Sequence, residues 1–138
     1  MKYIITIFSF IGVFGTLQTL ASELNIFTDV SRASGEVRVY LENIGQINIV
    51  VLTKNLTTGK SGDTLTLSPD EHVVILNKRK RTLKEDISNY GAVKLKPGEI
   101  TYIHRPVIDI EHGTLMYKIN KKWAILHEVW GGETKTTF

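Results

Sequence analysis

The residues whose types are suited to catalysis are scattered along this chain. The histidines include no pair at His-x-His spacing, and the chain has no cysteine. Neither a Gly-x-Ser-x-Gly elbow nor a phosphate-binding glycine loop followed by a helix is present. A triad assembled in space from distant residues is the alternative. The sequence therefore predicts no catalytic residue, no cofactor and a protein that is not an enzyme.

One turn carries the residue types of a metal site. Asp109, Glu111 and His112 are close in sequence and offer oxygen and nitrogen ligands. If they converged in a cleft, they would indicate a small metal- or ligand-handling enzyme. The same residues are also typical of a solvated turn. We favour the turn and predict no metal site.

The densest charge is the run Lys78-Arg79-Lys80-Arg81, with Lys84 shortly after it. Such a run predicts contact with an anionic partner: a lipid headgroup, a cell-wall polymer or an acidic protein. The alternative is a solvated connection whose charges prevent edge-to-edge pairing of a neighbouring strand. The acidic residues at 85 and 86 favour that alternative, and the anionic contact is the hypothesis to be tested.

Aromatic residues suggest a second contact surface. Trp123 and Trp130 are separated by an odd offset on one predicted strand, so they should face opposite sides. Trp130, next to two glycines at the strand end, is then the exposed one. Arg38 and Tyr40 share the strand face that points away from the core. An exposed Trp or Tyr near Arg is typical of a binding hot spot.

Short strands must position these side chains. Residues 36–42 alternate, with Val39 and Leu41 inward and Arg38 outward, and Pro97-Gly98 has the composition of a tight turn. Residues 57–63 and 77–91 are predicted connections, the second with one or two helical turns near 84–88. Further strands are predicted at 47–52, 64–67, 73–75, 93–95, 99–106, 114–119 and 123–130, the fifth bent or ended at Pro106 and the last two forming a hairpin. This pattern predicts an all-β fold, an antiparallel sandwich of roughly seven to nine short strands, with a small β-barrel as the alternative.

Two segments resemble the strands and turns of the immunoglobulin-like sandwiches common in exported bacterial proteins. They are Val39-Tyr40-Leu41-Glu42-Asn43 and Leu95-Lys96-Pro97-Gly98-Glu99. The resemblance spans most of residues 22–138 and implies an immunoglobulin-like β-sandwich. It does not include the cysteine pair of antibody-type domains.

The first residues are typical of an export signal. Lys2, an apolar run over 4–20 and the small residues of Thr19-Leu20-Ala21 predict a signal peptide at 1–21, with a retained anchor as the alternative. Residues 22–138 then form a single domain with a polar tail from about 131 and no membrane span, in a bacterial periplasm or outside the cell. The net charge of +3 is close to balance, which argues against nucleic-acid binding.

These observations favour a non-enzymatic, exported interaction module that binds an envelope protein or an anionic surface. The alternative is an inhibitor or immunity-type protein that inserts residues 77–91 into a partner's site. The metal- or ligand-handling enzyme is the least favoured function. Neither the partner nor the oligomeric state follows from the sequence.

Overall fold

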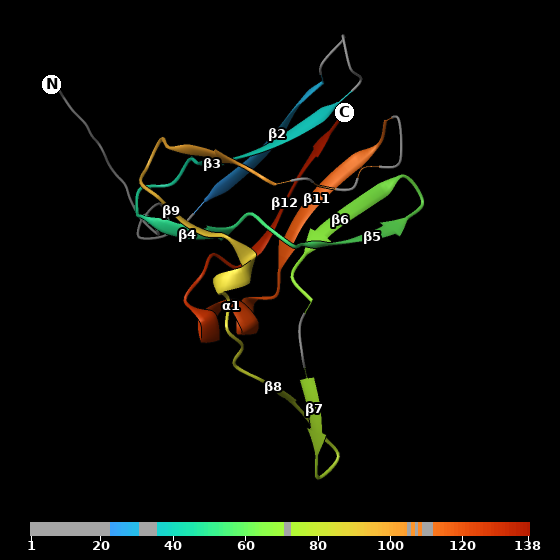
Figure 1. Ribbon diagram of the computed structural model, residues 1–138, viewed down its shortest axis with the longest axis vertical. Coiled ribbons are helices and arrows are strands. Elements are labelled where there is room, and N and C mark those ends of the chain that lie inside the picture. The colour runs from blue at the N-terminus through green and yellow to red at the C-terminus, as the bar shows by residue number, and fades with distance from the viewer. Residues whose placement is uncertain (1–22, 31–35, 71–72, 105, 107, 109–111) are drawn as a thin grey trace, which may run out of the picture.

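The structure is a computed structural model that describes residues 23–30, 36–70, 73–104, 106, 108 and 112–138. The predicted signal peptide lies outside these ranges. Within them the chain is mainly β, with one α-helix, α1 (Lys121–His127), and one 3-10 helix (Ser88–Tyr90) (Figure 1). No helix of the described part is both long and apolar enough to cross a membrane. The strands are β2 (Leu24–Val30), β3 (Val37–Asn43), β4 (Ile49–Leu52), β5 (Thr57–Ser61), β6 (Thr64–Ser68), β7 (Val73–Leu76), β8 (Arg79–Thr82), β9 (Ala92–Leu95), β10 (Ile100–Tyr102), β11 (Thr114–Ile119) and β12 (Gly132–Thr137).

The strands form two larger sheets and two strand pairs. One sheet has the order β10-β3-β2 and the other the order β12-β11-β6-β5, while β4 pairs with β9 and β7 with β8. All neighbouring strands are antiparallel except β6 and β11, which run parallel. The predicted all-β, sandwich-like architecture is therefore confirmed, although this parallel pair departs from a purely antiparallel prediction. No sheet of the described strands closes into the small barrel that was the alternative.

The inner faces of both larger sheets contribute to one apolar core. In β3, Val39 and Leu41 are fully buried whereas Arg38 is exposed, as the alternation predicts. Across the core, β6 and β11 supply further side chains, and α1 covers one end. The fully buried residues include Ile26, Leu65, Leu67, Leu115, Tyr117, Ile119 and Trp123.

Strand β4 is buried on both faces, which agrees with its apolar sequence. Ile49, Val51 and Leu52 are all buried, although β4 pairs with β9 alone. Its other edge is satisfied from elsewhere: the backbone N–H of Trp130 donates to the Val50 carbonyl at 2.8 Å. The Tyr117 hydroxyl occupies the neighbouring position on that edge, against Leu52.

The predicted strand over 123–130 is wrong, because residues 123–127 belong to the helix α1 and residues 128–130 lie in no strand. The Asn120 side chain accepts hydrogen bonds from two backbone N–H groups of the first helical turn, at 2.9 and 3.1 Å. The helix ends where Glu128 adopts a left-handed conformation, with φ of 59°. Its buried residues recur at helical spacing: Trp123, Ala124 and His127.

Two polar segments form strands where none was predicted. Residues 57–61 form β5 instead of a loop, and residues 132–137 form β12 instead of a polar tail. Each lies at an edge of the four-stranded sheet, β5 against β6 and β12 against β11. Strand β5 has no strand partner on its outer flank among the described strands, so its composition can remain polar. Strand β12 also lies against β2, and its polar residues alternate between half-buried and exposed.

The Pro97-Gly98 turn forms as predicted. The N–H of Glu99 donates to the Lys96 carbonyl at 2.9 Å, and Gly98 has φ of 87°. This is the geometry of a type II turn, which requires positive φ at its third residue. The turn passes the chain from β9, in one strand pair, to β10, in the three-stranded sheet.

We expect Gly98→Val to lower the free energy of unfolding by roughly 1–2 kcal/mol, measured by chemical denaturation. A Cβ at Gly98 would meet no atom within 4 Å, so the loss comes from backbone strain alone. Gly59→Val in β5 is the matched control, because a Cβ there is equally free of contacts and φ is not left-handed. Equal stability of the two variants would show that the turn does not need glycine.

Candidate interaction surfaces

Strands β7 and β8 form a hairpin that extends away from the body of the protein (Figure 1). Its loop has two residues, Asn77 and Lys78, with φ of 52° and 64°. Positive φ at both positions defines a type I′ turn, whose twist matches that of the two strands. The segment 77–91, predicted as a connection with helical turns near 84–88, therefore begins with this turn and β8, and its only helical residues are Ser88–Tyr90.

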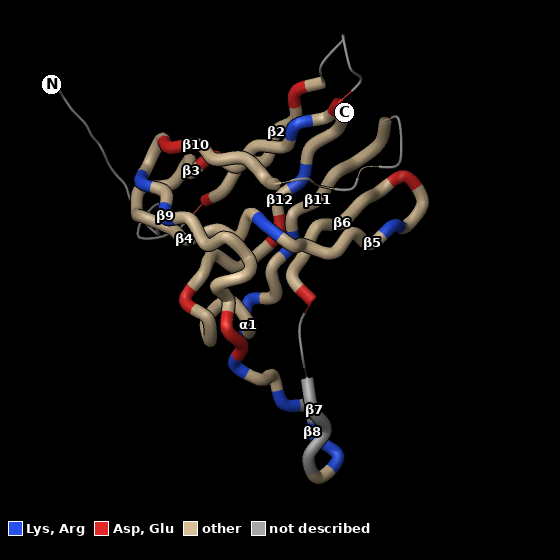
Figure 2. The backbone as a smooth tube through the Cα atoms, viewed as in Figure 1, with Lys and Arg blue, Asp and Glu red and all other residues tan. Residues whose placement is uncertain are grey.

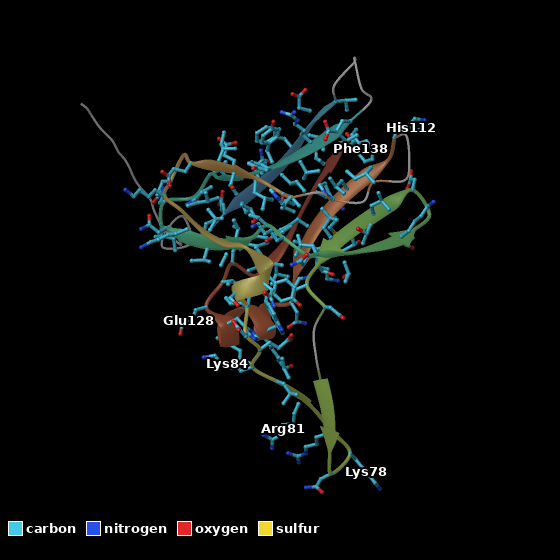
Figure 3. All side chains as sticks on the ribbon, in the orientation of Figure 1. Lys78, Arg81, Lys84, His112, Glu128 and Phe138 are labelled. Atoms are coloured by element: carbon cyan, nitrogen blue, oxygen red, sulfur yellow. The ribbon has the colours of Figure 1, made fainter. Side chains whose placement is uncertain are left out.

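The hairpin carries the basic run found in the sequence. Lys78 lies in the loop at the tip, and Arg79, Lys80 and Arg81 form most of β8. Figure 2 shows blue, basic segments on this hairpin. Lys78, Arg79, Arg81 and Lys84 are exposed, and Figure 3 shows the labelled Lys78 and Arg81 pointing away from the ribbon. Their exposure makes these positive charges accessible to a partner.

A buried cluster holds the base of the hairpin against α1. The backbone N–H of Glu85 donates to Nε2 of His127 at 2.8 Å, and the indole N–H of Trp123 donates to Oε2 of Glu85 at 3.0 Å. Nδ1 of His127 lies 2.7 Å from the Trp123 carbonyl, and the two rings stack at 3.9 Å. Since a backbone N–H can only donate, Nε2 accepts and Nδ1 carries the proton. His127, predicted to lie on a strand, instead links the hairpin's base to the body.

The three-stranded sheet presents a row of aromatic side chains on its outer face. Tyr40 lies between Phe27 of β2 and Tyr102 of β10 in register, and its ring stacks on Phe27 at 5.1 Å. Tyr102 is 55% exposed, and its ring lies 5.7 Å from that of His104. Arg38, two residues before Tyr40, extends the same face. The structure thus keeps Arg38 and Tyr40 together on an accessible surface.

A groove of about 720 Å³ runs beside this row. Its lining includes Arg38, Tyr40, Tyr102, His104 and Pro106. Tyr102 and His104 were missed as site residues by the sequence analysis. The signal for them is the register, because pairing β10 with β3 places Tyr102 opposite Tyr40.

Trp130 is not the exposed aromatic that the sequence predicted. It is 8% exposed and packs against Tyr117, with the ring centroids 5.9 Å apart. Its indole N–H is the one buried side-chain polar atom of the described residues that has no hydrogen-bond partner. The prediction failed because it placed Trp130 at the end of a strand, whereas Trp130 follows the last turn of α1 and packs into the core.

The metal alternative named Asp109, Glu111 and His112 as ligands. Asp109 and Glu111 lie outside the described residues, and His112 is exposed (Figure 3). Within the residues that the structure describes, no three His, Asp or Glu side chains are grouped closely enough to hold a metal ion.

A scan against protein-family models and searches of curated proteins and of solved structures each found no match.

Proposed function

We propose that this protein is an exported, non-enzymatic interaction module that contacts an anionic partner through the β7–β8 hairpin. The observation that carries the proposal is the position of the basic run: it lies on a hairpin that leaves the body, where Lys78, Arg79 and Arg81 are exposed. A projecting, positively charged element meets a partner before the rest of the surface does, and it accelerates association with an anionic one.

Export and an immunoglobulin-like topology are parts of the same proposal. Export rests on the apolar residues 4–20 and the small residues before Ser22. The immunoglobulin-like assignment rests on the alternation of β3 and on the Pro97-Gly98 turn, together with the open, mainly antiparallel sheets.

The test replaces Lys78, Arg79, Lys80 and Arg81 with serine and compares affinity capture from an envelope extract. We expect the variant to lose the captured partner, and wild-type capture to weaken as salt rises, because exposed charges are screened beyond about 8 Å at physiological ionic strength. The circular-dichroism spectrum and melting temperature should stay nearly unchanged, since Lys78, Arg79 and Arg81 are exposed on a hairpin that extends away from the body.

A matched control removes the same charge from the body of the protein. Lys60, Lys94, Lys96 and Lys118 are exposed and lie far from the hairpin in sequence, so their replacement with serine should leave capture intact. If the hairpin variant captures the same partner at the same salt concentration, the proposal is wrong.

The inhibitor or immunity-type alternative inserts residues 77–91, which include β8, into the site of a partner. A second candidate function is ligand binding in the groove beside Tyr102, favoured by the size of the groove and the exposed rings. Tyr102→Ala tests this second function and should abolish capture from the envelope extract. The four-serine variant, with serine at residues 78–81, should then still capture the partner.

A further inference from the structure

Strand β7 consists of four apolar residues, Val73-Val74-Ile75-Leu76, and among the described strands it pairs only with β8. The register places three of them opposite a basic residue: Val74 faces Arg81, Ile75 faces Lys80 and Leu76 faces Arg79. The hairpin therefore has an apolar strand along one edge and a basic strand along the other. A two-stranded hairpin is marginally stable in water without further packing, so a surface that covers β7 would stabilise it.

The charge of the hairpin differs from that of the remaining chain. Residues 73–82 include four basic residues and no acidic residue, whereas the whole chain has a net charge of only +3. Outside the hairpin the charges thus sum to a slightly negative value. An anionic surface attracts the hairpin and not the body. The molecule is therefore oriented with its hairpin toward that surface.

Resting on the function proposed above, we infer that the hairpin's partner is an anionic lipid membrane. A bilayer supplies both features that the hairpin requires: negative headgroups for Lys78 and β8, and the boundary of the acyl chains for β7. Each basic residue near an anionic membrane raises affinity by roughly fivefold, so four of them contribute a factor of several hundred.

Two other occupants fit the hairpin less well. An acidic protein would match the charge of β8 but leaves the apolar sequence of β7 without a role. A second copy of this chain would pair its own β7 with this one, yet it would bring two basic hairpins together and oppose association. The combination of an apolar strand and a basic strand favours the membrane.

The experiment measures sedimentation of the protein, as purified from the expressing cells, with vesicles. One set contains phosphatidylglycerol and phosphatidylcholine, and the other phosphatidylcholine alone. We expect at least tenfold tighter binding to the anionic vesicles, and loss of that preference when Lys78, Arg79, Lys80 and Arg81 are replaced with serine. The Lys60, Lys94, Lys96 and Lys118 serine variant should keep it. Because every variant has the same residues 1–22, any binding by that apolar segment cancels in the comparison.

Two measurements test the part played by β7. Val74→Ser with Ile75→Ser should weaken vesicle binding by about tenfold while its salt dependence remains. In a Leu76→Trp variant, lipids brominated on their acyl chains should quench the added tryptophan only in anionic vesicles. This quenching reports contact with the bilayer and does not depend on whether the serine variant keeps its hairpin.

Several results would overturn the inference. One such result is equal binding to both vesicle types. Another is binding to soluble polyglutamate without binding to vesicles, which would indicate that the partner is an acidic protein. A dimer that the β7 serine variant abolishes would indicate a second copy. If vesicle binding is absent but the four-serine variant still loses capture from a detergent-solubilised extract, the lipid inference alone is wrong. If the four-serine variant keeps both capture and vesicle binding, the proposed function is wrong as well.

Discussion

Val39→Asp is expected to abolish cooperative folding. Val39 is fully buried in β3, the central strand of its sheet, and its carbonyl accepts a hydrogen bond from the N–H of Ile103 at 2.8 Å. An unpaired carboxylate at this position costs several kcal/mol, on the order of the whole stability of a small domain. Circular dichroism during heating should therefore show no cooperative transition in the variant.

Arg38→Asp, one residue earlier, is the matched control because Arg38 is exposed. Asp29 lies opposite position 38 in register, so the control adds a like-charge pair across two strands, which costs less than about 1 kcal/mol. The control should melt cooperatively at nearly the wild-type temperature. Equal tolerance of both substitutions would contradict the assignment of an inward and an outward face to β3.

Alternation predicted the strands that have one buried and one exposed face. In β3 and β6 every second residue is buried, which is the pattern that the sequence shows. Strand β5 is mostly exposed, and β12 alternates only between half-buried and exposed polar residues. Pairing to a neighbouring strand, rather than apolar burial, holds both in place. Backbone hydrogen bonds form whatever the side chain is, so a polar edge strand leaves little trace in the sequence.

The helix α1 was misread for a different reason. Residues 123–126 are all apolar, so their periodicity does not distinguish a strand from a buried helix. The capping residue Asn120 was the available sequence signal, and it was interpreted as part of a hairpin turn. Contacts of Trp123 and His127 with Glu85, distant in sequence, then favour the helix, and local sequence patterns do not reveal them.

The candidate surfaces could be predicted in part. Charge density alone identified the basic run, and strand alternation placed Arg38 and Tyr40 on an outer face. The projection of the hairpin depends on β7 pairing with β8 and not with a larger sheet, which composition does not determine. Likewise, the addition of Tyr102 to the row containing Tyr40 depends on the β3–β10 register.

One buried hydroxyl joins two parts of the fold. Tyr117 of β11 is fully buried, and its hydroxyl both accepts from the N–H of Leu52 and donates to the Leu52 carbonyl, each at 2.9 Å. Burial raises the pKa of Tyr117, so the hydroxyl keeps the proton that it donates. The four-stranded sheet is thereby linked to the outer edge of β4, where none of the described strands pairs with it.

Tyr117→Phe should be strongly destabilising because it removes both hydrogen bonds and retains the burial. The N–H and the carbonyl of Leu52 would lose these partners, and each unsatisfied buried group costs about 1–3 kcal/mol. The free energy of unfolding should fall by roughly 2–5 kcal/mol and the melting temperature by about 10 °C or more. Amide exchange at Leu52 should also become faster.

Tyr90→Phe is the matched control. Its hydroxyl donates to the Asp70 carbonyl at 3.3 Å in an exposed setting, so its removal should cost no more than about 0.5 kcal/mol. If the two variants have the same melting temperature, the contact between Tyr117 and Leu52 does not hold β4 to the four-stranded sheet.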